Sequence, residues 1–491
     1  MRRFLLFLKE SAKVYDPLEY ILIDNIQPEV IRLDYQNNAI CGRSLRTKTI
    51  SNAEKLTYTG SLLGQNMIYS FVTMYVMFFF TDLLRIPSES VTVIVVAASL
   101  WDAVNDILMG MIADRTKTRW GKFRPYLLAG PFVIAVTTVL CFWNFGGSAV
   151  GTVAVAAVCY VLWGMSYTVY DIPIWAISSV SSHNADEKNG MVTLGKIGGT
   201  LGTVIVSVGS VALLNAFGGE RSAPAYAAAA ATIAGAGAFL LLLSGFVLRE
   251  RIAAPAKGVP FRRNIHTILD NTPLKALMVS LLVVNMVNNV RQVAQMYFAV
   301  YVWGDSSYVT YIGLSLVIGM IFGMAISPAL IRRFDKKYIF ITACAAGAVS
   351  SFLPFAVGGG PLPGLILLGI SFAFTGVTTI SSTSMLMDAI DYAEHKLGFR
   401  GEGVVFSMNT FLNKLSSTIS KGLLGVSLTA MHYVDNMPPN ETVQTGFSAI
   451  VYVVPAVCFL LAIVPLAFYR LKPAQIETIR AELENRRTAE K

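Results

Sequence analysis

Twelve apolar stretches, each long enough to cross a lipid bilayer, follow one another along this chain of 491 residues. A transmembrane helix needs about 20 predominantly apolar residues. Only 14% of the residues are charged, against roughly 25% in a soluble domain. The pattern excludes a soluble multidomain enzyme and predicts an all-α polytopic membrane protein with twelve transmembrane helices. We expect the spans at residues 57–83, 90–113, 126–146, 150–176, 191–216, 224–248, 274–303, 309–331, 338–357, 363–388, 403–432 and 446–470.

The spans form two sets of six, separated by a polar segment rich in Arg and Lys. Residues 1–55 are expected to be a cytoplasmic extension, either disordered or translated from a start codon placed too far upstream. Their apolar run is too short for a signal peptide, and no cleavage signal follows it. The domain boundaries that we predict are 56–248 for the N-terminal six-helix bundle, 249–273 for a cytoplasmic linker, 274–470 for the C-terminal six-helix bundle and 471–491 for a cytoplasmic tail.

Lys and Arg are distributed unequally between the two ends of the predicted spans. Of the Lys and Arg residues in the loops between spans, nearly all lie in loops 2–3, 4–5, 6–7, 8–9 and 10–11, whereas the opposite loops contain only Arg85 and Arg221. Cytoplasmic loops are enriched in these residues, so both termini are predicted to be cytoplasmic, in a bacterial plasma membrane. The loop charges also account for the net charge of +9 without nucleic acid as a partner. Lipid and a small solute are the expected partners, and we expect a functional monomer.

Motifs of enzymes and of ATP-driven pumps are missing from the sequence, which has no GxxxxGK[ST], HExxH or GxSxG pattern. Four of the five cysteines lie inside apolar spans, and none forms a CxxC pair. We therefore expect no catalytic residue, no organic cofactor, no disulfide and no metal site beyond that of a coupling cation.

Six ionisable side chains lie well inside the predicted spans. A charged residue near the middle of the bilayer costs about 2.5–3.5 kcal/mol on the insertion scale. Such residues pair with one another, face water or bind a ligand, so a polar cavity is predicted in the middle of the bundle. The six residues are Asp102, Asp106, Asp171, Lys196, Arg291 and Lys414.

The second span carries the sequence WDAVND, in which Asp102 and Asp106 are four residues apart and share one helical face. Asn105 adds an amide oxygen close to that face. Two adjacent carboxylates repel each other, and a small hard cation bound by their oxygens relieves the repulsion. The alternative is that both carboxylates pair with intramembrane basic residues, and the two arrangements are compatible at different stages of a cycle.

The fourth span ends in YTVYDIPIW, where Trp175 follows Asp171 by four residues. Pro173 removes a backbone donor next to Asp171, which leaves carbonyl oxygens free to line a cavity. A carboxylate accepts hydrogen bonds from hydroxyls, and an indole face covers the apolar side of a sugar ring. A structural Asp beside an interfacial Trp explains the pattern equally well.

Arg291 lies near the middle of the seventh span. Its guanidinium keeps its charge and suits the bidentate capture of a carboxylate. The partner is either Asp102 or Asp106, which we favour, or the carboxylate of an acidic substrate such as a uronide.

Four segments together resemble the glycoside–pentoside–hexuronide:cation symporters of the major facilitator superfamily. The resemblance extends in register from about Leu56 to Arg470, and Gly110 to Arg115 also resemble the loop 2–3 signature of the superfamily. The segments are WDAVNDILMG, DRTKTRWGKFRPY, DIPIW and DAIDYAEHKLGFRGEG.

This resemblance implies two six-helix bundles with alternating access around a site in the middle of the membrane. It implies a site for the coupling cation, which is Na⁺, Li⁺ or H⁺, at Asp102, Asn105, Asp106 and Thr168. The candidates for substrate binding, among which Arg291 comes from its position alone, are Asn66, Asp171, Trp175, Lys196, Arg291 and Lys414. The candidates for gating at the cytoplasmic ends of the helices are Asp114, Arg115, Asp388, Asp391 and Glu402.

Two departures from the family pattern concern the substrate. The chain has Gln65 and Asn66 where a well-studied member has Lys and Asp, and Lys196 where that member has Arg. An amide in place of a carboxylate changes which hydroxyl pattern fits. The expected activity is therefore cation-coupled uptake of a glycoside, pentoside or hexuronide. The alternative is a transporter of lipid, lysolipid or another solute on the same fold, which predicts a laterally open apolar cavity.

Overall fold

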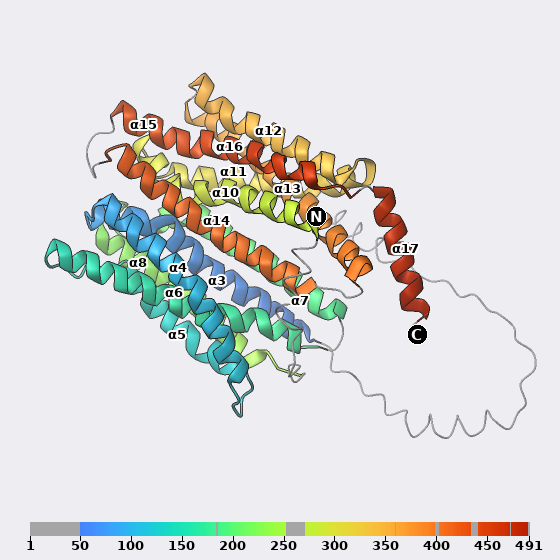
Figure 1. Ribbon diagram of the computed structural model, residues 1–491. Helices are drawn as coiled ribbons and strands as arrows, with labels where there is room; N and C mark the ends of the chain where they lie inside the picture. Colours follow the sequence, from blue (N-terminus) through green and yellow to red (C-terminus); the bar gives the residue numbers. More distant parts are fainter. Residues whose placement is uncertain are drawn as a thin grey trace, which may run out of the picture. The chain divides into compact units, whose positions relative to one another are not determined.

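The computed structural model describes residues 50–182, 185–251, 271–358, 360–397, 402–433, 440–471 and 473–489. The predictions for residues 1–49 and for most of the linker at 249–273 lie outside the described residues. Long helices that lie side by side make up nearly all of the described chain (Figure 1).

The first half of the chain contributes six long helices. Helix α3 packs on α7 and α8, α5 packs on α6 and α8, and α4 packs on α6. The first helix continues into a π-helical turn, η1. The elements are α3 (Asn52–Phe78), η1 (Phe79–Leu83), α4 (Ser88–Arg115), α5 (Arg124–Cys141), α6 (Ala149–Val180), α7 (Ala185–Ala216) and α8 (Ala223–Val247).

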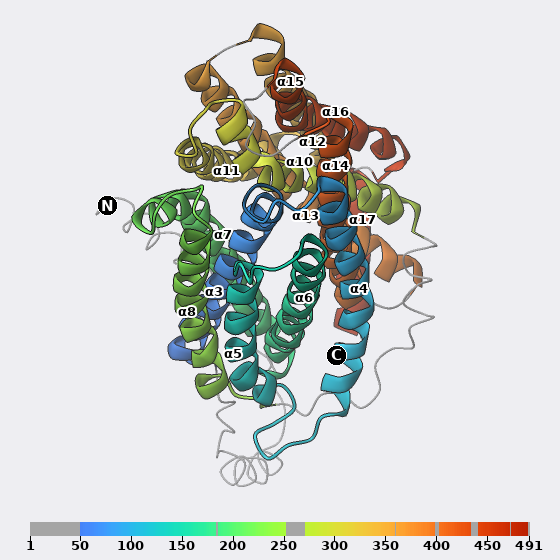
Figure 2. The ribbon, with the colours of Figure 1, turned by 90° about the vertical axis from the view of Figure 1, so that its left-hand side faces the viewer.

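The second half contributes the long helices α10 to α14 and a last span made of α15, η2, α16 and η3. Helix α11 packs on α13, α12 on α13 and α16, and α10 on α14 and α16. Figure 2 shows α3, α5, α6, α7 and α8 together below α10, α11, α12, α15 and α16. The elements are α10 (Thr272–Tyr301), α11 (Tyr308–Arg333), α12 (Lys336–Val357), α13 (Pro361–Leu397), α14 (Glu402–Ala430), α15 (Glu441–Ser448), η2 (Ala449–Val453), α16 (Val454–Ile463), η3 (Val464–Phe468) and α17 (Pro473–Ala489).

Eleven helices of the described chain are long and apolar enough to cross a bilayer, with α15 to η3 counted as one. Helix α14 corresponds to the predicted eleventh span, 403–432, and its lysines, serines and threonines make it too polar to be among them. It packs on α10 in its own half and on α4 in the other half, so protein surrounds these polar residues. The predicted all-α polytopic architecture is confirmed.

Several helix ends differ from the predicted boundaries. Helix α3 begins at Asn52, inside the stretch assigned to the extension, because Ser51 and Glu54 form a capping box there. Helix α13 continues to Leu397, nine residues beyond the predicted end at 388. The polar segment from Glu441 to Ser448 is helical and extends the last span, and the predicted tail contains α17.

The halves contact one another through α4 and α14, α7 and α11, and α3 and α10. We call the end at residues 79–88, which is predicted to be external, the outer end, and the opposite end the inner end. At the outer end, the hydroxyl of Thr310 donates to the carbonyl of Val208 at 3.0 Å, and Gly313 packs on Ser207. Hydrogen bonds join the halves at the outer end and in the middle of the bundle.

Asp82 is the centre of the outer-end contact and is buried. Its carboxylate accepts hydrogen bonds from Thr81 of its own turn and from Tyr301 and Tyr433 of the second half. The hydroxyls of Thr81 and Tyr297 are 2.7 Å apart. These bonds join the first half to the second half at the end where η1 meets α4.

Candidate functional site

Asp106 of α4 joins three helices in the middle of the bundle. Its Oδ1 accepts a hydrogen bond of 2.9 Å from the hydroxyl of Thr168 on α6. Its Oδ2 accepts one from the ammonium group of Lys414 on α14. The structure thus brings together two predicted cation ligands and one predicted sugar-site lysine, and the lysine comes from the other half.

Asp102 lies one turn away on α4, and its carboxylate packs on the α-carbon of Gly164 of α6. Its Oδ1 is buried and has no hydrogen-bond partner among the described residues. The side chain of Asn105, beside it, is also buried. A buried carboxylate oxygen without a donor is costly, and oxygen atoms are the ligands that hard cations prefer. The oxygens of Asp102, Asp106 and Thr168 therefore fit a small monovalent cation.

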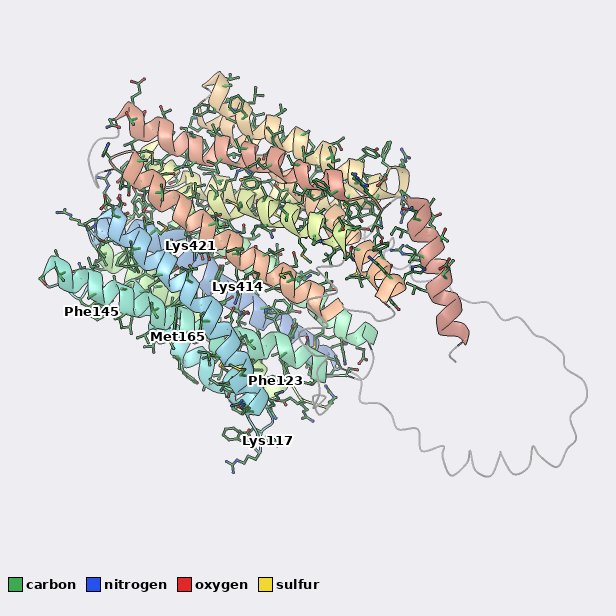
Figure 3. All side chains as sticks on the ribbon, in the orientation of Figure 1. Lys117, Phe123, Phe145, Met165, Lys414 and Lys421 are labelled. Atoms are coloured by element: carbon green, nitrogen blue, oxygen red, sulfur yellow. The ribbon has the colours of Figure 1, made fainter. Side chains whose placement is uncertain are left out.

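Asp171 of α6 is the second carboxylate beside Lys414. Its Oδ1 accepts hydrogen bonds of 2.7 Å from Gln65 Nε2 on α3 and of 3.1 Å from Trp175 Nε1. Its Oδ2 is 3.7 Å from Lys414 Nζ. Lys414 therefore contacts both a predicted cation-site carboxylate and the predicted sugar-site carboxylate. Figure 3 shows Lys414 along the middle part of α14.

Aromatic rings of α3 and α6 form a layer next to these carboxylates. The centroid of Tyr69 is 5.2 Å from that of Tyr167, and Trp163 is 5.7 Å from both Tyr167 and Tyr160. The hydroxyl of Tyr69 lies 3.5 Å from that of Ser417 on α14. Aromatic faces of this kind suit the apolar side of a sugar ring.

The two other predicted sugar-site residues of the first half, Asn66 and Lys196, lie on α3 and α7. Asn66 donates to the carbonyl of Leu62 in its own helix and lies against Gly199 of α7. Lys196 is exposed on α7. The amide that contacts Asp171 belongs to Gln65 instead.

Arg291 lies within the second half, between α10, α12, α13 and η2. Its Nη2 donates to the hydroxyls of Ser351 and Ser371, at 2.8 and 3.0 Å. Its Nε is 3.4 Å from the carbonyl of Val451, and its guanidinium carbon is 4.9 Å from the centroid of Phe372. The predicted pairing of Arg291 with Asp102 or Asp106 is absent from the described contacts. Arg291 lies on α10 and the two aspartates on α4, and α14 packs on both of these helices.

The predicted gating residues that the structure describes lie near the inner end. Asp388 accepts from Lys336 at 2.7 Å and from Arg480 at 2.9 Å, and Asp391 accepts from Arg480 at 3.0 Å. These ion pairs tie α13 to α12 and α17 within the second half. Arg115 is exposed at the end of α4. The side chains of Asp114 and Glu402 lie outside the described residues.

Sequence reasoning missed two charged residues inside the spans. Lys421 follows Lys414 by two turns of α14 and is buried, and Asp82 is buried at the outer end. Both fall inside predicted spans, at 403–432 and 57–83, so a complete inventory of intramembrane charges would have found them.

The fold and the site define a multi-pass membrane transporter, in which ionisable residues of two helical halves meet in the middle of the bundle. A family model described as "MFS/sugar transport protein" matches residues 58–473. The chain belongs to this family, which confirms the predicted membership in the glycoside–pentoside–hexuronide:cation symporter family of the major facilitator superfamily. It is a transporter and not an enzyme.

Two relatives and one solved structure illustrate the similarity. The chain is 26% identical to the "Uncharacterized symporter YjmB" of Bacillus subtilis (strain 168) over 89% of its length and 96% of the relative. It is 28% identical to the "Putative glycoside/cation symporter YagG" of Escherichia coli (strain K12) over 85% and 92%. The crystal structure of a D-xylose-proton symporter matches with a TM-score of 0.62 at 13% identity, over 86% of this chain and 98% of that one. This likeness confirms the major facilitator fold.

Proposed function

We propose that this chain is a symporter that takes up a glycoside or a related sugar together with Na⁺, Li⁺ or H⁺. The observation that carries the proposal is the position of Lys414, whose ammonium contacts Asp106 and also lies 3.7 Å from Asp171. The family of the chain and the printed name of YagG, a glycoside/cation symporter, support a sugar and a cation as the two solutes.

The cation half of the proposed site consists of Asp102, Asn105 and Asp106 on α4 and Thr168 on α6. The contact between Asp106 and Thr168 and the unpartnered Oδ1 of Asp102 support it. A cation bound there would replace Lys414 as the counter-ion of Asp106.

The sugar half consists of Asp171 and Trp175 on α6, Gln65 on α3 and Lys414 on α14. Asp171 would accept hydrogen bonds from sugar hydroxyls, and the indole would cover a ring face. We keep Asn66 of α3 and Lys196 of α7 as further candidates for the sugar site, where these two helices meet. Arg291 is left out, because its contacts lie within the second half.

The shared lysine gives coupling a physical basis. A cation bound at Asp106 neutralises the carboxylate that attracts Lys414. The ammonium of Lys414 then becomes available to Asp171 and to sugar hydroxyls. Binding of sugar to Lys414 likewise frees Asp106 for a cation. Each solute then raises the affinity of the site for the other, as thermodynamic linkage requires.

Alternating access would use the contacts between the halves. The bonds of Asp82 close the outer end in this structure. We propose that Asp114, Arg115, Asp388, Asp391 and Glu402 act at the inner end when the chain opens outward. We also propose that the chain works as a monomer in a bacterial cytoplasmic membrane, with both termini inside.

The test is counterflow of radiolabelled solutes into vesicles that contain only the purified protein. A panel of neutral glycosides, pentosides and glucuronides should contain at least one that exchanges, and a gradient of Na⁺, Li⁺ or H⁺ should drive its accumulation. Asp106→Cys should abolish accumulation and preserve exchange. Exchange of lysolipid without exchange of any sugar would overturn the proposal in favour of the lipid alternative.

A further inference from the structure

Lys421 is a second lysine inside the bundle that the proposed coupling does not use. Its side chain is buried, and its Nζ donates to the hydroxyl of Tyr160 on α6 at 3.1 Å. Figure 3 shows Lys414 and Lys421 along the same helix. Lys421 therefore joins the second half to the first half, two turns of α14 toward the outer end from Lys414.

Helices α4 and α14 run in opposite directions, because Gly425 packs on Thr92 whereas Lys414 contacts Asp106. The two lysines therefore face the two carboxylates of α4 in order, with Lys414 at Asp106 and Lys421 nearer to Asp102. Lys414 forms an ion pair with Asp106. No ion pair within 4.0 Å joins Lys421 to Asp102 among the described residues.

Asp102 is the carboxylate that faces Lys421. The charged and titratable groups close enough to Lys421 to interact with it electrostatically are Tyr160 of α6, Tyr69 of α3 and Asp102 of α4. The charged groups that interact electrostatically with Asp102 are Lys421 and Lys414 of α14 and Asp106 of its own helix. An ammonium buried in a membrane protein needs an opposite charge, and Asp102 has a buried oxygen that lacks a hydrogen-bond donor.

We propose that Lys421 is a resident cation that competes with the coupling cation for Asp102 and so sets the affinity of the site for that cation. This inference rests on the proposed function. The hydrogen bond to Tyr160 keeps the ammonium off Asp102 in this structure, and the flexible four-carbon stem allows it to move onto the carboxylate when the cation leaves. Lys421 acts through Asp102 and is a positioning residue.

Two substitutions should act in opposite directions. Lys421→Met removes the competing charge and keeps the length of the side chain. The concentration of Na⁺, Li⁺ or H⁺ that gives half-maximal sugar uptake should therefore fall about tenfold or more. Tyr160→Phe removes the hydroxyl that holds the ammonium away from Asp102, so that concentration should rise. Lys421→Arg, which keeps the charge, should stay near the wild type.

The experiment measures uptake of one radiolabelled sugar by vesicles that contain the full chain, against Na⁺, Li⁺ and external pH in turn. The concentration of sugar for half-maximal exchange without a cation gradient is the control, and it should change less than the cation dependence. A structural role alone would weaken both together and would not produce opposite shifts in Lys421→Met and Tyr160→Phe.

An unchanged or weakened cation affinity in Lys421→Met would overturn the inference. If Lys421→Met does not fold, Tyr160→Phe tests the inference alone. A half-saturating cation concentration below that of the wild type in Tyr160→Phe would then overturn the inference. Asp106→Cys separates this failure from that of the proposed function. Loss of accumulation in Asp106→Cys with no shift in Lys421→Met rejects only the role of Lys421, whereas cation-driven accumulation that survives in Asp106→Cys rejects the cation site itself.

Discussion

Gly164 and Asp102 illustrate how one missing side chain shapes the site. A Cβ atom at position 164 would collide with Oδ1 of Asp102. Because α4 and α6 are packed helices, the displaced carboxylate would have to adopt another rotamer, away from Asn105 and Asp106. The absence of a side chain at Gly164 thus leaves room for the observed orientation of the Asp102 carboxylate.

We expect Gly164→Ala to raise the cation concentration for half-maximal uptake by about tenfold, because a ligand oxygen is displaced. Gly209→Ala is the matched control, since a Cβ atom there meets nothing within 4 Å. The cation dependence of sugar uptake in vesicles is the measurement. Equal behaviour of the two variants would show that the orientation of Asp102 does not matter for the cation.

Asp171→Ala should abolish sugar binding and leave cation binding measurable. Asp171 is the proposed acceptor for sugar hydroxyls and contacts Gln65 and Trp175, whereas the proposed cation ligands belong to other residues of α4 and α6. Equilibrium binding of radiolabelled sugar and of the cation to purified protein tests this. Unchanged sugar affinity would remove Asp171 from the site.

Asp102, Asp106, Asp171 and Lys414 could be singled out from the sequence as site candidates because charges inside apolar spans stand out whatever the packing. The sequence reasoning placed Asn66 at the sugar site, whereas the amide that contacts Asp171 belongs to Gln65. Neighbouring residues of a helix point about 100° apart, so the choice depends on how α3 is rotated. The glycines of α7 that pack on α3 fix that rotation, and their contacts are long-range.

At the scale of an element, the start of α5 depends on a residue that lies just after the end of α8. The carboxylate of Glu250 accepts hydrogen bonds from the backbone N–H groups of Lys122, Phe123 and Arg124, at 2.9, 2.7 and 3.1 Å. These N–H groups have no partner within the helix. Gly121, with a φ of 114°, brings the chain close to Glu250, and a Cβ atom there would collide with it.

Glu250→Ala should destabilise the protein by about 1–3 kcal/mol, because three backbone donors lose a charged acceptor. The midpoint of thermal unfolding in detergent should fall accordingly. Glu477→Ala, on an exposed position of α17, is the control and should leave the midpoint unchanged. Similar midpoints for both variants would contradict this role of Glu250.

Arg291 ties together four elements of the second half without a carboxylate partner among the described residues. Replacing a buried charge by an apolar side chain of similar length is often neutral or stabilising. The hydroxyls of Ser351 and Ser371 are 2.8 Å apart and keep each other as partners. The contacts of this residue predict a role in packing rather than in the choice of substrate.

We therefore expect Arg291→Met to keep or raise the thermal midpoint and to change transport of a neutral glycoside and of the matching glucuronide by the same factor. Uptake of the two solutes by the same vesicles gives that ratio. A selective loss of glucuronide transport would instead place Arg291 in substrate recognition.

At the scale of the whole molecule, the closed outer end depends on Asp82 and three tyrosines of the second half. The loop charges predicted which end is external, and the periodic apolar spans predicted two bundles. The pairing of the halves through Asp82 could not be predicted, because it depends on which of two access states the chain adopts. Each state buries different side chains of the same sequence.

Asp82→Ala should loosen the outer end. Ser207 is buried where α7 meets α11, so a Ser207→Cys reporter should react slowly with a membrane-impermeant maleimide added outside. The reaction should become about tenfold faster when Asp82→Ala is added, because the loss of the two hydrogen bonds from Tyr301 and Tyr433 costs the closed state about 1.4 kcal/mol or more. Equal rates with and without Asp82→Ala would show that these bonds do not hold the outer end closed.

The charges in the middle of the bundle have an electrical consequence. In the proposed site, ionised Asp102, Asp106 and Asp171 contribute three negative charges and Lys414 and Lys421 contribute two positive ones, so without a bound cation this site would have a net charge of −1. One monovalent cation makes it neutral. A membrane potential of 100 mV acts on one elementary charge with about 2.3 kcal/mol, and only the empty site carries such a charge. An inside-negative potential would therefore speed the return of the empty protein to the outward-facing state, and leave the crossing of the loaded protein almost unaffected.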